Sequence, residues 1–214
     1  MSRTVGSSGV KTEAAIRAAA LKLISAQGYE LTSLRHLAAE VGILPAAIYR
    51  YFPSKTHLLC ALIEDHIQEL QQGWAKACPK TDDPEAQLRA FVSFHVKMHA
   101  GREKEIFVAD RELRSLPPED YKRMSDLLKG YERILTDILQ RGMDQGVFVL
   151  EDASVATYAF LAMMTGVCHW FQDGGRVSRQ RVVEYYTQLV LHGALGRANG
   201  QEATADRSRS VAAG

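Results

Sequence analysis

The chain has 214 residues, of which 46% are hydrophobic and 24% are charged, and its formal net charge is +1. These values are typical of a globular protein with a substantial core, and they exclude wholesale disorder. Three scattered cysteines are too few for a disulfide framework, and the first residues lack the apolar run of a secretory signal. We therefore expect a cytoplasmic protein with reduced thiols.

The charge is distributed unevenly along the chain. Residues 1–60 contain seven basic and three acidic side chains, a net charge of +4, whereas residues 61–214 have a net charge of −3. Basic segments favour polyanions through counterion release. A net charge of this size in sixty residues is also common in proteins without such a partner, so charge alone leaves nucleic-acid binding open.

Between its two ends, the chain has helical periodicity almost throughout. Residues 1–10 are rich in glycine and serine, so we expect a flexible N-terminal arm. The following apolar residues recur at helical spacing up to Gly28, which is suited to end a helix. Thr32 or Ser33 can cap a second, short helix, and Gly42 ends it.

The remaining elements are also predicted to be helical. Pro45 fits the first turn of a third helix over residues 45–51, and Ser54 can cap a long fourth one. After a linker, apolar spacing predicts five more helices, over residues 88–98, 106–113, 118–139, 153–171 and 179–195. The sequence therefore predicts an all-α fold of about nine helices. Residues 197–214 are polar and small, and we expect a disordered tail.

Residues 153–171 contain no charged side chain, and this length approaches that of a membrane-spanning helix. Polar residues within the segment and the lack of basic flanks oppose insertion, so we expect no membrane partner. We expect instead a helix buried on most faces, either in the core or against a partner chain. The helix predicted over 179–195 has its own apolar stripe, which makes a symmetric interface through residues 153–195 the natural arrangement.

The strongest local signal lies between residues 31 and 59. Two short helices joined by a tight turn at Gly42 describe a helix-turn-helix. A recognition helix must be narrow at its leading end to enter the major groove, and tyrosine, arginine and lysine side chains around it can contact phosphates or bases. The candidate DNA-binding residues are Ser33, Arg35, Leu44, Pro45, Ala46, Tyr49, Arg50, Tyr51 and Lys55. Phe52 is expected in the core, and the alternative that Tyr49 and Tyr51 join it there stays open.

Residues 31–43 (LTSLRHLAAEVGI) and 47–55 (AIYRYFPSK) resemble the DNA-binding signature of the TetR family of bacterial transcriptional repressors. The resemblance is specific over residues 11–60, and the helix count and length extend it loosely to the whole chain. It implies a homodimer with a DNA-binding domain at residues 11–56 and a ligand-binding and dimerisation domain at residues 57–196. A bound small molecule would change the spacing of the two DNA-binding heads and release a near-palindromic operator.

Two features depart from the family pattern. Leu44 is a poor N-cap, and the small residues that follow it offer no side-chain hydrogen-bond donors. Direct base reading is therefore expected from Arg35, Tyr49 and Arg50, from apolar contacts to thymine methyls, or from DNA shape.

The second part of the chain resembles the acyl-CoA-responsive members of the family, on the stretch 107–114, the Leu116-Pro117-Pro118 run and the Tyr131-Glu132 pair. Such a sensor needs an apolar tunnel and cationic groups at its mouth. The candidate ligand-binding residues are Phe91, Phe94, His95, Met98, Arg102, Phe107, Arg111, Met124, Leu128, Tyr131, Met163, His169 and Trp170. The alternative is that the apolar side chains are only core and that the arginines pair with neighbouring acidic residues.

Three other functions stay open at this point. A metal-responsive repressor would use His95 and His99, spaced i, i+4, or the Cys168-His169 pair, but no CxxC or HExxH motif is present. A repressor of the same fold responding to a free aromatic or lipophilic compound is the second alternative. The third is a helical enzyme with a dispersed site, although the chain has no GxSxG, P-loop or GxGxxG motif. We expect no enzyme, no cofactor and no metal.

Overall fold

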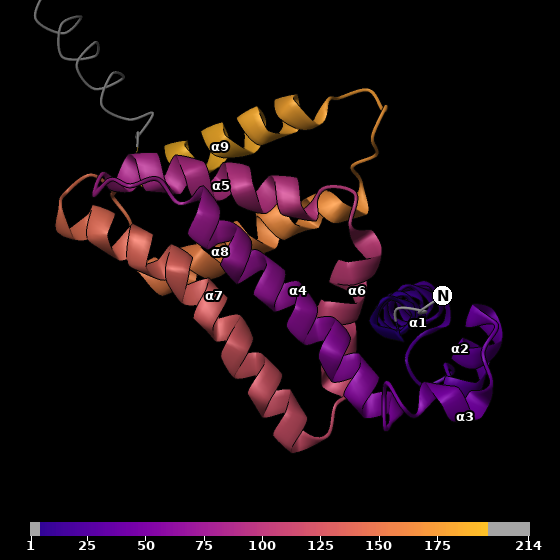
Figure 1. Ribbon diagram of the computed structural model, residues 1–214. Helices are drawn as coiled ribbons and strands as arrows, with labels where there is room; N and C mark the ends of the chain where they lie inside the picture. The colour runs from indigo at the N-terminus through magenta and orange to yellow at the C-terminus, as the bar shows by residue number, and fades with distance from the viewer. Residues whose placement is uncertain (1–4, 197–214) are drawn as a thin grey trace, which may run out of the picture.

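The computed structural model describes residues 5–196, and within them all regular structure is helical, which confirms the predicted fold class. Figure 1 shows the elements in order. They are α1 Val5–Gln27, α2 Leu34–Val41, α3 Pro45–Ile48, α4 Lys55–Ala77, α5 Pro84–His99, α6 Glu103–Arg111, the 3-10 helix η1 Glu112–Ser115, α7 Pro118–Asp144, α8 Ala153–Thr165, the 3-10 helix η2 Gly166–His169, and α9 Arg179–Leu195.

Side chains at the helix ends explain where the short helices begin and stop. Ser33 caps α2 by accepting a hydrogen bond from the His36 backbone N–H at 3.2 Å, and Ser54 caps α4 by accepting from the His57 N–H at 3.0 Å. Gly42 ends α2 in the left-handed region, at φ 73°, which a side chain would disfavour. Thr32, the other predicted cap, is buried and donates to the Gly28 carbonyl instead.

The prediction of a flexible arm over residues 1–10 is wrong for its second half, because α1 already begins at Val5. Two glycines and two serines lower helix propensity by about 1 kcal/mol or less per residue, which a long helix tolerates once it has nucleated. Residues 1–4 and the predicted tail at residues 197–214 lie outside the described part of the chain.

Two other helices are shorter than predicted. The third ends at Ile48 rather than at residue 51, because the backbone N–H groups of Tyr51 and Phe52 both turn back to the Ile48 carbonyl. The helix predicted over 153–171 stops at Thr165, where Gly166 introduces a 3-10 turn. Glycine is a weak helix former, and a tight turn of this kind is common at helix ends.

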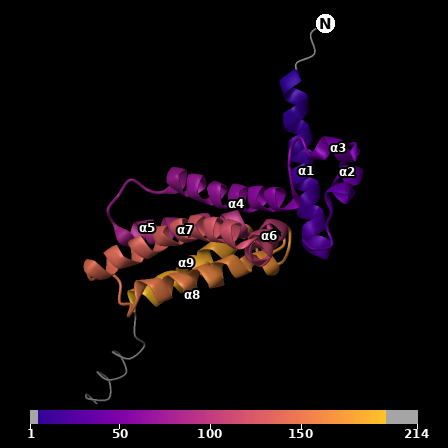
Figure 2. The ribbon, with the colours of Figure 1, turned by 90° about the horizontal axis from the view of Figure 1, so that it is seen from below.

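The helices form a small head and a larger body. Helices α1 to α3 lie to one side of the molecule, and α4 runs from them into the body formed with α5 to α9 (Figures 1 and 2). The core of the head includes Ile16, Leu37, Ile48 and Phe52, and it continues along the first half of α4 as far as Ile67. The predicted boundary between residues 56 and 57 therefore falls inside one continuous helix.

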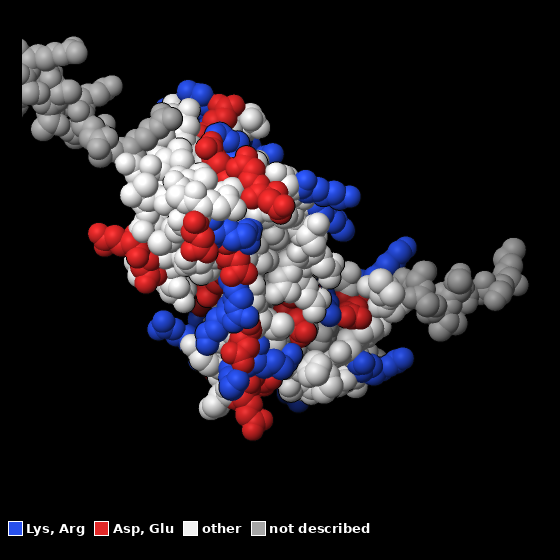
Figure 3. Space-filling view, turned by 90° about the vertical axis from the view of Figure 1, so that its left-hand side faces the viewer, with Lys and Arg blue, Asp and Glu red and all other residues white. Residues whose placement is uncertain are grey.

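The body packs around α5. This helix contacts α4, α7, α8 and α9, and its Leu88, Phe91, Val92 and Val96 are fully buried. Basic and acidic side chains are interleaved over the face of the molecule drawn in Figure 3. Pairs of this kind, such as Lys122 with Asp126 at 2.7 Å, recur along the body helices. The body therefore has a mixed surface, unlike the predominantly basic sequence of the head.

Helix α8 is buried on one face only within the single chain, so burial of its other faces against a partner chain stays a prediction. Within the single chain only Ala153, Thr157 and Met164 of this helix are buried, whereas Val155 is 65% and Tyr158 is 59% exposed. On α9, Tyr185 and Leu189 are likewise 50% and 58% exposed. None of the helices in the described part of the chain has the length and apolar character needed to cross a membrane.

Candidate functional site

The segment that begins α3 presents small and apolar groups to solvent. Leu44 is 76% exposed, and Pro45 and Ala46 beside it are exposed as well. Ile48 and Phe52 are buried in the head core and hold this segment in place. The narrow leading end that a groove-binding helix needs is thus present, anchored from behind by two apolar side chains.

Three exposed polar side chains accompany this segment. Arg35 lies in the first turn of α2, Tyr49 is 52% exposed directly after α3, and Arg50 follows it. Neither arginine forms a hydrogen bond or an ion pair with a described residue, so both guanidinium groups can bind a phosphate or a base edge.

Ser33, Tyr51 and Lys55 have structural partners. The Ser33 hydroxyl oxygen caps α2, and Tyr51 is half-buried against the head core. The Lys55 ammonium donates to the carbonyls of Tyr29 at 2.9 Å and Glu30 at 3.3 Å and lies 4.0 Å from the centroid of the Tyr29 ring. Two of its three N–H groups are already used, so one N–H remains for a phosphate, and the contact of Lys55 with DNA stays a prediction.

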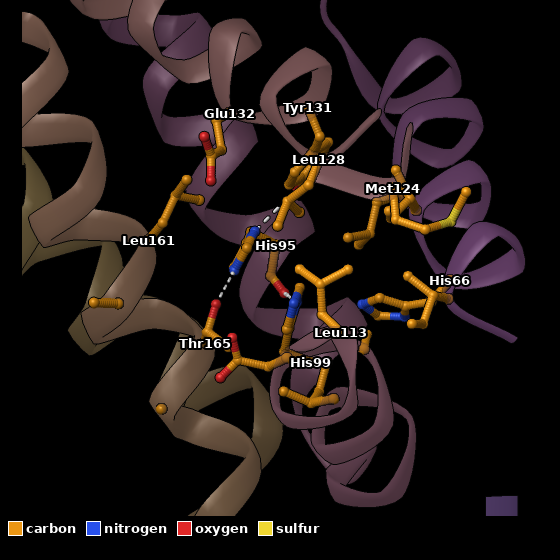
Figure 4. Close-up of a pocket in the computed structure, with 18 of the residues that line it drawn as sticks. His66, His95, His99, Leu113, Met124, Leu128, Tyr131, Glu132, Leu161 and Thr165 are labelled. Atoms are coloured by element: carbon orange, nitrogen blue, oxygen red, sulfur yellow. Dashed lines mark hydrogen bonds between the residues drawn. The ribbon is translucent and has the colours of Figure 1, made fainter. Parts of the chain in front are cut away.

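The body contains a cavity of about 460 Å³ whose walls come from five helices, α4 to α8, and from η1 and η2. Figure 4 shows the side chains that line it. Five of the predicted ligand-binding residues lie in its wall, namely His95, Met124, Leu128, Tyr131 and His169.

Most of the other predicted apolar residues pack elsewhere. Phe91 is fully buried against Trp74, with ring centroids 5.1 Å apart, and the Phe94 ring lies 6.0 Å from the same indole. Met98 and Met163 support the body core, and Phe107 supports the head core. Trp170 is 52% exposed and does not line the cavity. The apolar face of each helix contains both core residues and cavity-lining residues, so periodicity alone cannot tell which of them line the cavity.

The two arginines that were predicted to bind the ligand also lie outside the cavity wall. Arg102 pairs with Glu69 at 2.8 Å and Glu105 at 3.2 Å. Arg111 is exposed and stacks over the Phe107 ring at 5.3 Å. The alternative of arginines paired on their own surface therefore describes Arg102, and among the described residues that line the cavity there is no lysine or arginine.

Sequence reasoning missed several polar residues of the wall. His66, Glu132 and Thr165 line the cavity, and His99 does so in a role other than the metal ligand considered for it. His66 interrupts an otherwise apolar stripe of α4 between Ile63 and Ile67, and this interruption was the available signal. Thr165 carried no comparable signal, because it meets His95 only through the packing of α8 on α5.

His95, Tyr131 and Thr165 form a hydrogen-bonded cluster in the cavity wall (Figure 4). His95 Nδ1 lies 3.0 Å from the Tyr131 hydroxyl, and its Nε2 lies 3.0 Å from Thr165 Oγ1. The His99 ring stacks on His95 with centroids 3.8 Å apart, and His99 Nδ1 lies 2.8 Å from the His95 carbonyl oxygen. Burial lowers the pKa of His95 well below its usual value and lowers the pKa of His66 and of His99 to about 4. All three imidazoles are therefore neutral near pH 7.

This bonding does not support the metal-responsive alternative. Both His95 nitrogens face hydroxyl groups, and one His99 nitrogen is taken by the backbone. Within residues 5–196, no three or more histidine, cysteine or acidic side chains are grouped to hold a metal ion. Cys168 is buried outside the cavity wall, and its neighbour His169 is exposed.

The cavity opens between α6 and α8. Four residues both line the cavity and are exposed to solvent, namely Asp110, Tyr158, Ala162 and His169. The wall residues from α4 and α5 are buried. The site is thus a mainly apolar chamber with neutral histidines and hydroxyl groups at its deep end and two acidic residues, Asp110 and Glu132, elsewhere in its wall. This arrangement is suited to a largely apolar small molecule.

Two elements of the wall also contact the head. Helix α4 contributes Ile63, His66 and Ile67 to the wall, and its first turns belong to the head core. Helix α6 packs on α1 and continues into η1, where Glu112 accepts a hydrogen bond from the Tyr29 backbone N–H at 3.1 Å. Both elements therefore form a direct physical connection between the cavity wall and the head.

Comparisons with known proteins agree with the division of the structure into a head and a body. Residues 16–62 match the family described as bacterial regulatory proteins, tetR family, and residues 81–194 match the tetracyclin repressor-like C-terminal domain. The fatty acid metabolism regulator protein of Bacillus subtilis is 27% identical over 128 residues, which is 60% of this chain and 66%, just under two thirds, of that protein.

Solved structures share the fold. A bacterial regulatory protein in the tetR family from Rhodococcus RHA1 superimposes with a TM-score of 0.80 at 27% identity, over 86% of this chain and 97% of that one. The complex of AibR with isovaleryl coenzyme A and operator DNA superimposes with a TM-score of 0.76 at 23% identity, over 86% of this chain and 99% of that one.

Proposed function

Because this chain belongs to the TetR family and is a ligand-responsive transcriptional repressor, we propose that its head binds a near-palindromic operator and that a hydrophobic effector in the body cavity releases it. The observation that carries this proposal is the pair of helices, α4 and α6, that both line the cavity and contact the head. An effector that displaces them changes the position of the head relative to the body.

The DNA contacts are assigned to the surface around α3. We infer that Leu44, Pro45 and Ala46 approach the bases, where apolar groups can contact thymine methyls, and that Arg35, Tyr49 and Arg50 supply the polar contacts. Ser33 and Lys55 support this surface from within. The assignment follows from exposure and from the lack of described partners for the two arginines.

For the effector, we propose an acyl-CoA thioester whose acyl part occupies the cavity. The apolar wall and the volume of about 460 Å³ suit an acyl chain but not a whole nucleotide. The CoA part would then remain outside the mouth, near Asp110 and the exposed Arg111. The names of the Bacillus relative and of the AibR complex support this effector class, because one refers to fatty acid metabolism and the other to isovaleryl coenzyme A.

The homodimer is proposed to form through α8 and α9. The exposed Val155, Tyr158, Tyr185 and Leu189 are the apolar residues of these helices that a second copy of the chain would cover. Because Tyr158 also lines the cavity, the partner subunit would stand close to the mouth.

DNA binding is tested on a labelled fragment of the neighbouring promoter. We expect the wild-type protein to bind it at least 100-fold more tightly than random DNA of the same length. Arg50→Ala or Tyr49→Ala should each weaken this binding about 5- to 100-fold, whereas Lys76→Ala, on the far end of α4, should leave it unchanged. Equal affinity for random DNA, or indifference to both head variants, would contradict the proposal.

Effector release is tested by titrating acyl-CoAs of increasing chain length, and the matching free acids, into the protein–DNA complex. We expect thioesters to release DNA at lower concentration than the acids, because no cation in the described cavity wall can pair with a carboxylate. Release by a free aromatic compound, with no response to any thioester, would instead establish the lipophilic-compound alternative.

A further inference from the structure

The deep end of the cavity contains a buried polar atom without a partner. His66 on α4 is 7% exposed, and its Nδ1 makes no hydrogen bond with any described residue. Figure 4 shows the His66 ring directed toward Leu113 and His99. Leaving a buried imidazole nitrogen unpaired is unfavourable, so this position favours a ligand that completes the bond.

The neighbouring His99 has a defined hydrogen-bonding state. Its Nδ1 lies 2.8 Å from the His95 carbonyl oxygen, and since a carbonyl can only accept, Nδ1 carries the proton and donates. Burial keeps the imidazole neutral, with a pKa of about 4. The other nitrogen, Nε2, is therefore an acceptor, and no described residue donates to it.

These two rings are close enough to share one ligand group. Their centroids are 5.8 Å apart and their planes are nearly perpendicular, at 83°. An atom that makes a hydrogen bond of about 2.8 Å to a nitrogen on each ring fits such a separation. His95 does not compete for this atom, because both its nitrogens are taken by Tyr131 and Thr165.

The neutral His66 ring carries one proton, and we place it on the unpaired Nδ1, so the group that completes both bonds must accept from His66 and donate to His99. A thioester or ketone carbonyl only accepts, so it leaves the His99 acceptor unpaired. A carboxylate also only accepts, and it would bring a charge to a place where the described wall offers no cation. A hydroxyl group donates one hydrogen bond and accepts another, and it is small enough for a mainly apolar chamber.

We propose that the space between His66 and His99 is a subsite for a hydroxyl group on an otherwise apolar ligand, so that the effector is a hydroxylated lipid. The hydroxyl donates to His99 Nε2 and accepts from His66 Nδ1. The inference builds on the proposed effector cavity, and it specifies which chemical group the deep end recognises.

The test measures binding of ligand pairs that differ in one group, by titration calorimetry on the full-length protein. Decanoyl-CoA is compared with 3-hydroxydecanoyl-CoA and 10-hydroxydecanoyl-CoA, which place the hydroxyl at two depths. Decan-1-ol is compared with 1-methoxynonane, an ether of the same size that accepts but cannot donate. We expect at least one hydroxylated ligand to bind about 5- to 30-fold more tightly than its partner, the effect of one or two net hydrogen bonds.

Variants assign the preference to the two rings. His66→Leu and His99→Leu should each abolish the preference for the hydroxylated ligand while leaving the unhydroxylated one bound. His66→Asn, which keeps a polar atom near the position of Nδ1, should retain part of it, and His57→Leu, at an exposed histidine outside the cavity wall, should retain all of it. If a leucine variant fails to fold, the ring resonances of isotope-labelled His66 and His99 in the wild type should shift with the hydroxylated ligand and not with its partner.

The outcomes separate this inference from the proposed function. If the hydroxylated alcohol shows the preference while no thioester binds, the subsite is supported and the acyl-CoA proposal fails. If thioesters bind and release DNA without regard to the hydroxyl, only an ordered water occupies the site and the inference is overturned. A preference that survives in both leucine variants, or binding of no ligand at all, also overturns it.

Discussion

At the scale of single residues, the body cavity is defined by buried neutral histidines. His66, His95 and His99 are 7%, 2% and 3% exposed, and burial is the largest cause of the lowered pKa of each. In the unfolded chain the same side chains titrate near pH 6.5. Folding therefore holds them in the neutral form in a pH range in which the unfolded chain binds protons.

This difference predicts a loss of stability in mild acid. Because the folded-state pKa lies below the unfolded value, the unfolded chain binds more protons as the pH falls from about 6.5 toward 4. Each histidine then lowers the free energy of unfolding by about 1.4 kcal/mol per pH unit within that window and has no effect above it. Urea unfolding at pH 7 and pH 5 measures the change.

Two variants test the origin of this loss. His99→Leu should reduce the difference in the free energy of unfolding between pH 7 and pH 5. His57→Ala, at an exposed histidine of the first turn of α4, should leave that difference unchanged. A difference that is the same in all three proteins would show that the buried histidines do not cause it.

At the scale of elements, two glycines of α7 have opposite environments. A Cβ at Gly142 would overlap the Phe148 ring, which packs across the end of the helix, whereas a Cβ at Gly130 would meet only the end of the Gln71 side chain at 3.4 Å. The first glycine is therefore required by a close approach, and the second only lowers helix propensity.

The two alanine variants should change stability in opposite directions. Gly142→Ala should lower the free energy of unfolding by about 1–3 kcal/mol, because Phe148 must leave its buried position. Gly130→Ala should raise it by up to about 1 kcal/mol, through a smaller loss of backbone entropy. Denaturant unfolding of both variants checks the pair, and a stabilised Gly142→Ala protein would contradict the packing shown here.

The contact between η1 and the end of α1 is a second feature at this scale. Glu112 accepts hydrogen bonds from the Tyr29 backbone N–H at 3.1 Å and from the Ser115 hydroxyl at 2.8 Å. It therefore joins the continuation of a cavity-lining helix to the head. Removing this carboxylate separates the two without altering the cavity wall or the DNA surface.

We expect Glu112→Ala to bind operator and effector separately much as the wild type does, but to reduce the change in DNA affinity that the effector causes. Since coupling free energies are about 1–3 kcal/mol, a visible reduction is 5-fold or more in the ratio of affinities with and without effector. Glu119→Ala, an exposed substitution in the first turn of α7, is the control. An unchanged ratio in Glu112→Ala would show that the Glu112 hydrogen bond does not transmit the signal.

At the scale of the whole molecule, one long helix connects two differently charged parts. Helix α4 begins in the head core and ends in the body core, so the head is not an independent unit on a linker. The near-neutral total charge is the sum of a head sequence with +4 and a body sequence with −3. Only the basic head is then suited to bind DNA phosphates. This agrees with a repressor whose body binds a small molecule instead.

The exposed apolar face of α8 and α9 predicts the assembly. Leu189→Glu combined with Val155→Glu should convert the dimer into a monomer and abolish tight operator binding, because charges would be buried at the interface. Tyr121→Glu places the same charge on α7, at a residue that is 42% exposed, and should leave the dimer intact. Light scattering during size-exclusion chromatography at several concentrations measures the mass, and a double variant that stays dimeric would refute this interface.

The sequence by itself determined the helical class, most helix positions, the caps at Ser33 and Ser54, and the family, because these depend on local periodicity and on a motif of fixed spacing. The sequence also placed Phe52 correctly in the head core. The predicted start of α1 and the predicted end of α3 were wrong, because weak local preferences at these positions compete with helix propagation and with tight turns.

Only the tertiary structure decided which residues of an apolar stripe face the cavity. His95 meets Tyr131 and Thr165, which lie 36 and 70 residues away in sequence, and no local pattern predicts such contacts. The same packing removed Phe91, Met163 and Arg102 from the predicted site and brought in His66. Periodicity tells which face of a helix is buried, whereas the choice between core and cavity wall depends on how neighbouring helices cross.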